Sequence, residues 1–232
     1  MGVGNRVFLK KPEPGRELLD EFRKIPAANI ADVMGRSCAM NPRIKRMSTP
    51  SNPIMAGPAL TVKTRPGDNL MIHQALNMAA PGDILVVSNE SDSTRALMGA
   101  IMFTYAYCAK NLGGIILDGP LRDVEEVLKM DMPIYAAGST PGGPYKEGPG
   151  EVNVPISCGE IAVNPGDIIV ADWDGVIVVP LKDAEEILQA AKKFQEQDEQ
   201  KLAAAANGTA KREWVSKLLV TKGTEIIDGY CV

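Results

Sequence analysis

The chain has 232 residues and a formal net charge of −4 at pH 7, which fits one large α/β domain, or one such domain with a helical appendage. An acidic balance offers no basic stripe for nucleic acid, and no apolar run approaches the roughly 20 residues of a membrane-spanning helix. The first 15 residues lack the apolar core of a signal peptide. We therefore expect a cytoplasmic protein that binds neither nucleic acid nor a membrane.

The first quarter of the chain is predicted to be helical and then irregular. Apolar residues recur at helical spacing within residues 15–36, and Pro26 interrupts the run, so a second short helix is expected after it. Residues 37–58 are rich in proline and serine and predict mostly loop.

The middle of the chain alternates predicted strands with predicted helices. The strand candidates are short apolar runs bounded by turn residues, at 57–64, 81–89, 113–119 and 132–138. The helix candidates lie between them, at 67–79, 94–110 and 122–131, and the one at 94–110 is expected to be mostly buried. This alternation indicates an α/β core. A Gly- and Pro-rich loop at 139–150 is predicted to be either a lid over a site or a simple connection.

The last third of the chain predicts hairpins and then helix. Residues 151–180 give several strands separated by Pro-Gly-Asp and Asp-Trp-Asp-Gly turns. Asp172 and Asp174 lie in the second of these turns, and we favour a hairpin over a second metal site there. A polar helix is expected from Leu181, and Asn207-Gly208 should stop it before a short helical tail.

The cysteines and the histidine exclude several kinds of site. The four cysteines form no CxxC pair, so neither a zinc site nor a disulfide framework is indicated. Cys108 and Cys158 lie in apolar contexts and are predicted to be reduced core residues. His73 is the single histidine of the chain, and its helical face also holds Leu70 and Leu76. We therefore expect a packed histidine rather than a catalytic one.

The segment GGIILDGPLRDVEEV, residues 113–127, places an Arg-Asp pair directly after a core strand. One interpretation is structural, because an aspartate at a helix start satisfies free N–H groups. The other is functional, because ligands bind at the ends of α/β strands. There Arg122 would grip a carboxylate through two parallel hydrogen bonds, and Asp123 would hold a hard cation such as Mg²⁺. The local sequence leaves both interpretations open.

The segment RALMGAIM, residues 95–102, is open to two interpretations as well. Gly99 and Ala100 favour close helix packing through small residues. They also fit a helix start whose exposed N–H groups bind an anion.

Together these segments resemble one known family. The ordered motifs ANIADVMGR, GPALTVKTRPGDNLMIHQAL, RALMGA, GGIILDGPLRDVEEV and VNVPISCGEIAVNPGDIIVADWDGVIVVP resemble the 4-hydroxy-4-methyl-2-oxoglutarate and 4-carboxy-4-hydroxy-2-oxoadipate aldolases, a family that includes the regulator of ribonuclease activity A. The resemblance runs from about residue 28 to 180. It implies a swivelling ββα-type α/β sandwich over residues 1–180, with a C-terminal helical extension over 181–232, assembled as a homotrimer or homohexamer with active sites between subunits.

The resemblance also implies an activity and its residues. Members of this kind are class II, divalent-metal-dependent aldolases that release pyruvate from 4-hydroxy-2-oxo diacids and also decarboxylate oxaloacetate. By this resemblance Arg122 binds the substrate carboxylate and Asp123 binds Mg²⁺ or Mn²⁺. An acid from a neighbouring subunit completes the site, and Glu199 is preferred over Glu196. Backbone N–H groups that contact the substrate are expected at Gly99, Ala100, Ile101, Met102 and Phe103.

The alternative is a protein without enzymatic activity that binds ribonuclease E as a regulator. The long C-terminal helix and tail favour the aldolase. Some relatives carry a demethylmenaquinone methyltransferase label, but no glycine-rich S-adenosylmethionine motif follows the first strand.

Overall fold

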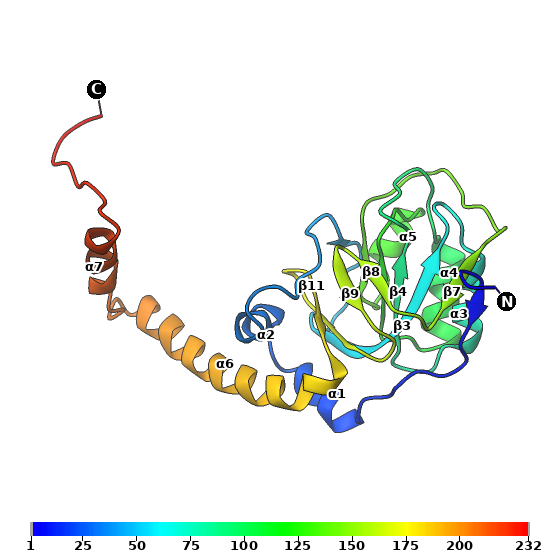
Figure 1. Ribbon diagram of the computed structural model, residues 1–232, viewed down its shortest axis with the longest axis horizontal. Coiled ribbons are helices and arrows are strands. Elements are labelled where there is room, and N and C mark those ends of the chain that lie inside the picture. Colours follow the sequence, from blue (N-terminus) through cyan, green and yellow to red (C-terminus); the bar gives the residue numbers. More distant parts are fainter. Residues whose placement is uncertain (1, 232) are drawn as a thin grey trace. The chain divides into compact units, whose positions relative to one another are not determined.

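The computed structural model describes residues 2–231 (Figure 1). Its strands are β1 (Arg6–Val7), β2 (Lys45–Arg46), β3 (Met55–Thr64), β4 (Ile84–Ser88), β5 (Gly114–Leu117), β6 (Ile134–Ala136), β7 (Gly150–Val152), β8 (Ile156–Cys158), β9 (Ile161–Val163), β10 (Ile168–Ala171) and β11 (Val176–Val179). Its helices are α1 (Arg16–Phe22), α2 (Ala27–Val33), α3 (Leu70–Met78), α4 (Ala100–Thr104), α5 (Val124–Leu128), α6 (Ala184–Ala206) and α7 (Glu213–Thr221), with a π-helical turn η1 (Tyr105–Ala109) and a 3₁₀ turn η2 (Leu181–Asp183).

The central sheet has the strand order β1-β7-β3-β4-β5-β6-β2. Its four middle strands, β3 to β6, run parallel and follow one another in the chain, with α3, α4 and α5 as the crossovers. β4 and β5 are buried along their whole length, as expected of parallel strands covered on both faces. The carboxyl ends of these strands therefore meet at one edge of the sheet.

The two faces of the sheet bury alternate residues of each strand. Leu85 and Val87 of β4 pack with the helices α3, α4 and α5. Ile84 and Val86 pack with strands β8 to β11 on the opposite face. Figure 1 shows the helices on one side of β3 and β4 and the β8–β9 hairpin on the other. The predicted α/β sandwich with a C-terminal helical extension is confirmed.

Each of the three Pro-Gly-Asp turns ends in a buried aspartate that binds a distant part of the chain. Asp83 forms an ion pair of 2.8 Å with Lys11 of the N-terminal segment. Asp167 accepts the N–H of Leu181 at 3.1 Å, next to the start of α6. Asp68 accepts two N–H groups of the loop that follows β6. Each carboxylate loses its hydrating water on burial and is hydrogen-bonded or paired instead with fixed donors of the protein, as a buried charge requires.

Three predictions about residues 94–110 are wrong: that the whole segment is helical, that the helix is mostly buried, and that Cys108 is a core residue. The first part of this segment is not helical, because Gly99 is extended (φ −137°, ψ −178°) and α4 begins only at Ala100. Much of the helical part faces outward, with Phe103 and Ala106 among its buried residues. Cys108 is exposed on this outer face, whereas Cys158 is buried as predicted. Tertiary pairing at the strand ends has overridden the local helical pattern.

The chain divides into two compact units, Met1–Lys192 and Lys193–Val232. The second unit holds the end of α6 and the amphipathic α7, whose Trp214 and Leu218 are exposed. No helix within residues 2–231 is long and apolar enough to cross a membrane. The folding of residues 1–180 as a domain separate from 181–232 stays a prediction.

The Lys11–Asp83 pair provides a test of the packing. The side chains are 5% and 4% exposed, and burial raises the pKa of Asp83. Breaking a buried pair from one side costs about 3–5 kcal/mol. Since the exposed Glu13 also pairs with Lys11, we expect Asp83→Asn to lower the free energy of unfolding by about 3 kcal/mol.

Urea denaturation of the single variant and of Lys11→Met/Asp83→Asn measures this effect. The double variant should be more stable than Asp83→Asn, because it leaves no charge buried. A double variant less stable than Asp83→Asn would mean that an unpaired Lys11 charge is not what destabilises the single variant.

Candidate active site at the carboxyl edge of the parallel strands

The loops that follow β4, β5 and β6 are hydrogen-bonded to one another at the carboxyl edge of the sheet. Leu121 forms parallel bridges with Met98 on one side and with Ser139 on the other. The N–H of Arg122 donates to the Met98 carbonyl at 3.0 Å, and the N–H of Leu121 donates to the Gly138 carbonyl at 3.0 Å. The sheet thus continues beyond its strands and places Arg122 at the position where α/β sheets bind ligands.

Asp123 joins the starts of two helices. Its backbone is in the left-handed region (φ 63°, ψ 47°), which aspartate tolerates better than most residues. Its side chain makes no capping bond to α5, and Oδ2 instead accepts the N–H of Ala100, at the start of α4, at 2.8 Å. The Asp123 side chain therefore does not cap its own helix α5 as the structural interpretation predicted.

Gly99 makes room for this contact. A Cβ atom at this position would lie 2.5 Å from Asp123 Oδ2 and 2.9 Å from Arg122 Nε. Arg122 and Asp123 lie side by side, with Nε 3.8 Å from Oδ2, and their side chains are 44% and 41% exposed. Both charged groups are thus accessible to a ligand, and the bond to the Ala100 N–H fixes the direction of the Asp123 carboxylate.

A cavity of about 200 Å³ opens beside this pair. Its walls are largely apolar, and its lining comprises Asn69, His73, Leu97, Met98, Gly99, Ile101, Met102, Arg122, Asp123, Pro144 and Lys146. Arg122 and Asp123 also border a second hollow of about 340 Å³ with Ser139, Thr140 and Pro141. The Arg-Asp pair therefore stands between two recesses at the sheet edge.

The backbone N–H groups predicted to bind substrate are partly engaged within the protein. Ala100 donates to Asp123, while Met102 and Phe103 donate to the Gly99 carbonyl at 3.0 and 3.1 Å. The Phe103 side chain is buried in the core, whereas Ile101 is 84% exposed. Of the five predicted residues, Gly99, Ile101 and Met102 line the cavity.

Glu199, the remaining predicted site residue, lies on α6 within the unit Lys193–Val232. It accepts a hydrogen bond of 3.2 Å from Gln195, one helical turn earlier. Its role at a neighbouring subunit's site stays a prediction.

The sequence did not predict three of the residues that line the cavity, namely Asn69, His73 and Lys146. Asn69 is 2% exposed, its Nδ2 donates to the Leu97 carbonyl at 2.9 Å, and its Oδ1 has no partner among residues 2–231. His73 lies one turn further along α3, half-buried, and burial, followed by the positive charge of Lys146, lowers its pKa. The i, i+4 spacing of Asn69 and His73 was a readable signal, whereas Lys146 sits in an irregular loop that gave none.

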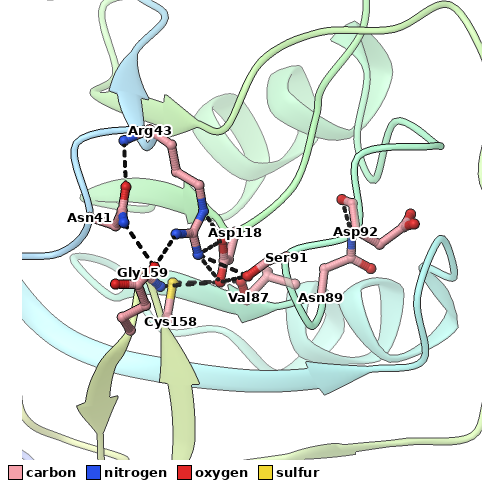
Figure 2. Close-up of polar contacts among 10 residues, drawn as sticks. Asn41, Arg43, Val87, Asn89, Ser91, Asp92, Asp118, Cys158 and Gly159 are labelled. Atoms are coloured by element: carbon pink, nitrogen blue, oxygen red, sulfur yellow. Dashed lines mark hydrogen bonds and ion pairs between the residues drawn. The ribbon is translucent and has the colours of Figure 1, made fainter.

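A polar network holds Asp118, the residue that follows β5 and starts the turn to Arg122 (Figure 2). Asp118 is buried, and its carboxylate accepts hydrogen bonds from Nε and Nη2 of Arg43, from Ser91 Oγ and from the N–H of Gly159. Arg43 Nη1 also donates to Glu160 at 2.8 Å. The network ties the end of β5 to the β8–β9 hairpin, and its polar groups bind one another rather than pointing at the cavity of Arg122.

The residues at this edge fit a hard divalent cation better than zinc. Within residues 2–231 no three His, Cys, Asp or Glu side chains cluster as metal ligands, as a zinc site would require. Mg²⁺ and Mn²⁺ need one or two carboxylates, and water and substrate supply the remaining oxygens. Asp123 offers such a carboxylate, since Oδ1 makes no hydrogen bond within the described residues while Oδ2 binds Ala100.

Comparison with known proteins shows to which family the chain belongs. A family model described as RraA-like, Aldolase/RraA, matches residues 27–178. A Halalkalibacterium halodurans protein named "Putative 4-hydroxy-4-methyl-2-oxoglutarate aldolase" is 37% identical over 206 residues, 88% of this chain and 96% of that protein. The Thermus thermophilus 4-hydroxy-4-methyl-2-oxoglutarate aldolase is 32% identical over 113 residues, 49% of this chain and 68% of that protein.

A solved structure supports the same placement. Streptomyces coelicolor RraAS2, described as an unusual member of the RNase ES inhibitor RraA protein family, superposes with a TM-score of 0.73 at 26% identity, covering 82% of this chain and 98% of that one. The family model covers β2 to β10, the crossover helices α3, α4 and α5, and the segment with Arg122 and Asp123. The chain belongs to the RraA-like family of aldolases and RraA proteins.

Proposed function

We propose that the protein is a divalent-metal-dependent carbon–carbon lyase. It cleaves 4-hydroxy-2-oxo diacids, such as 4-hydroxy-4-methyl-2-oxoglutarate or 4-carboxy-4-hydroxy-2-oxoadipate, and releases pyruvate. The observation that carries the proposal is the accessible Arg122–Asp123 pair beside one cavity at the carboxyl edge of the sheet. The names of the relatives support the same reaction.

Arg122 is the carboxylate anchor in this proposal. Its nearest acid is Asp123, at 3.8 Å, which is longer than a hydrogen bond. The planar guanidinium therefore keeps donors for two parallel bonds to the carboxylate of a 2-oxo acid. Gly99 and Ile101 are the best placed of the five expected amides, because Ala100 already donates to Asp123 and Met102 and Phe103 already donate to Gly99.

Asp123 is the residue that would hold Mg²⁺ or Mn²⁺. The bound cation would act as a Lewis acid on the oxo group of the substrate. Asp123 keeps its orientation through the Ala100 N–H, and Arg122 and the apolar walls of the cavity orient the substrate and exclude water around it. Aldol cleavage and oxaloacetate decarboxylation both break the bond between C3 and C4 and leave the electron pair on C3. We therefore expect both activities in one site.

A second candidate is regulation of ribonuclease E without catalysis. The likeness to RraAS2 favours it, because that structure is described as belonging to the RNase ES inhibitor family. A pyruvate-release assay with a panel of oxo acids, with and without EDTA, separates the two. Release that stops with EDTA supports the lyase, and inhibition of ribonuclease E without any release supports the regulator.

We also propose that the protein assembles as a homotrimer or homohexamer and shares its active sites between subunits. The exposed apolar residues of α7 are consistent with contacts to a second copy. Glu199 from a neighbouring subunit would then complete the site of Arg122 and Asp123.

Asp123→Asn tests the metal role. Asparagine also tolerates the left-handed backbone and can accept the Ala100 N–H, but it loses the negative charge that a hard cation prefers. Metal-dependent pyruvate release should fall at least a hundredfold or so, with unchanged thermal unfolding. Glu126→Gln, an exposed change on α5, is the control and should retain activity. Full activity of Asp123→Asn in Mg²⁺ would exclude Asp123 as the metal ligand.

Arg122→Lys tests the carboxylate anchor. Lysine keeps the charge but loses the two-bond geometry. A hydrogen bond to a charged group contributes roughly 1.5–3 kcal/mol, so kcat/KM should fall about ten- to a hundredfold. Steady-state kinetics on oxaloacetate and on 4-hydroxy-4-methyl-2-oxoglutarate measure the effect. Equal kcat/KM for both proteins on both substrates would remove Arg122 from the mechanism.

Mixing two inactive variants tests the shared site. Asp123→Asn and Glu199→Ala chains, co-expressed, should regain about a quarter of wild-type activity, because each site draws its two residues from independently assorted subunits. Each variant alone should stay inactive. Sedimentation of an active monomer of 24.8 kDa, or no gain on mixing, would contradict sites built from two subunits.

A further inference from the structure

The loop after β6 forms a wall of the cavity and is hydrogen-bonded to the segment before α3. Asp68 Oδ2 accepts the N–H groups of Glu147 at 2.6 Å and Gly148 at 2.9 Å. Tyr145 donates its N–H to the Gly67 carbonyl at 2.8 Å and accepts the N–H of Asn69 at 3.0 Å. Four bonds to one short segment before α3 thus hold residues 145–148 in place.

Arg95 fixes the preceding part of the same loop. Its Nη1 donates to the Gly143 carbonyl at 2.9 Å, and Nη2 donates to the Tyr145 hydroxyl at 2.7 Å. Its guanidinium also lies 4.0 Å from the centroid of the Tyr145 ring, a cation–π distance. Gly143 in turn abuts Arg122, since a Cβ there would lie 3.2 Å from Arg122 Nη1. The loop is therefore packed directly against the proposed carboxylate anchor.

This arrangement brings a second cation to the cavity. Lys146 lines it together with Arg122, and Lys146 makes no ion pair within residues 2–231. Asp123 is the acid of the lining, and most other lining residues are apolar. A cation bound at Asp123 would add further positive charge. Such a cavity is complementary to a ligand with two carboxylates rather than one.

We propose that Lys146 is a specificity-determining residue that binds the second carboxylate of a dicarboxylate 2-oxo acid whose first carboxylate is bound by Arg122. The inference rests on the proposed function, because it assigns Arg122 to the 2-oxo acid end. Lys146 supplies a point charge with three donors, which suits a carboxylate that differs in position between substrates. The loop contacts keep its backbone ordered before the ligand arrives, which lowers the entropic cost of binding.

Ligands that are not cleaved test the proposal without turnover. Isothermal titration in Mg²⁺ compares 2-oxoglutarate, which has two carboxylates, with 2-oxopentanoate, which has the same chain length and one. The wild type should bind 2-oxoglutarate more tightly. Lys146→Met should weaken 2-oxoglutarate binding about ten- to a hundredfold and change 2-oxopentanoate binding less than threefold or so. Lys146→Arg should largely restore the preference.

The matched control is Lys45→Met, an exposed lysine on β2 that lines neither recess, and it should bind both ligands as the wild type does. The proposal is overturned if Lys146→Met weakens both ligands equally, or weakens neither. Pyruvate release by the wild type is a separate measurement. Absence of release with the Lys146-dependent preference intact would remove the lyase assignment and leave the dicarboxylate site. If the wild type releases pyruvate but Lys146→Met still prefers 2-oxoglutarate, the lyase assignment stands and Lys146 is not the residue that binds the second carboxylate.

Discussion

The candidate active site of this protein depends on one close approach, in which the Asp123 carboxylate occupies the space that a side chain at position 99 would need. Gly99 has an ordinary extended backbone, so the requirement for glycine there is steric and not conformational. The approach lets one carboxylate bind the first N–H of α4 while its own residue precedes α5. The backbone of Arg122 is positioned by the same segment, because its N–H donates a hydrogen bond to the carbonyl of Met98, the residue before Gly99.

Buried aspartates organise the scaffold around this contact. Asp68 holds the loop that carries Lys146, Asp118 holds the turn that leads to Arg122, and Asp172 accepts the N–H of Ala27 at the start of α2. In each case donors of the protein replace the water that a carboxylate loses on burial: backbone N–H groups and, for Asp118, also the Arg43 guanidinium. Geometry is thus set by short polar contacts between loops, while the apolar layers on the two faces of the sheet supply the bulk of the packing.

The sequence predicted those features that depend on local pattern. Short apolar runs bounded by turns identified β3 to β6, and the motif after β5 located Arg122 and Asp123 at the sheet edge. Residues 94–99 could not be predicted in the same way, because the bridge between Met98 and Leu121 joins segments more than 20 residues apart. Lys146 enters the cavity through contacts made by Asp68 and Arg95, and no local periodicity encodes such contacts.

The bonding of the three edge loops restricts how their lengths can vary. Leu121 is paired on both sides, with Met98 and with Ser139, so an extra residue in the turn between Leu117 and Arg122 would move the pairing by one place and reverse the side chains that follow. Insertions are tolerated where backbone groups face water, for example among the exposed residues 51–53. Length variation among natural homologues should therefore collect in such outer loops, and the stretch from β5 to Asp123 should behave as a unit of constant length.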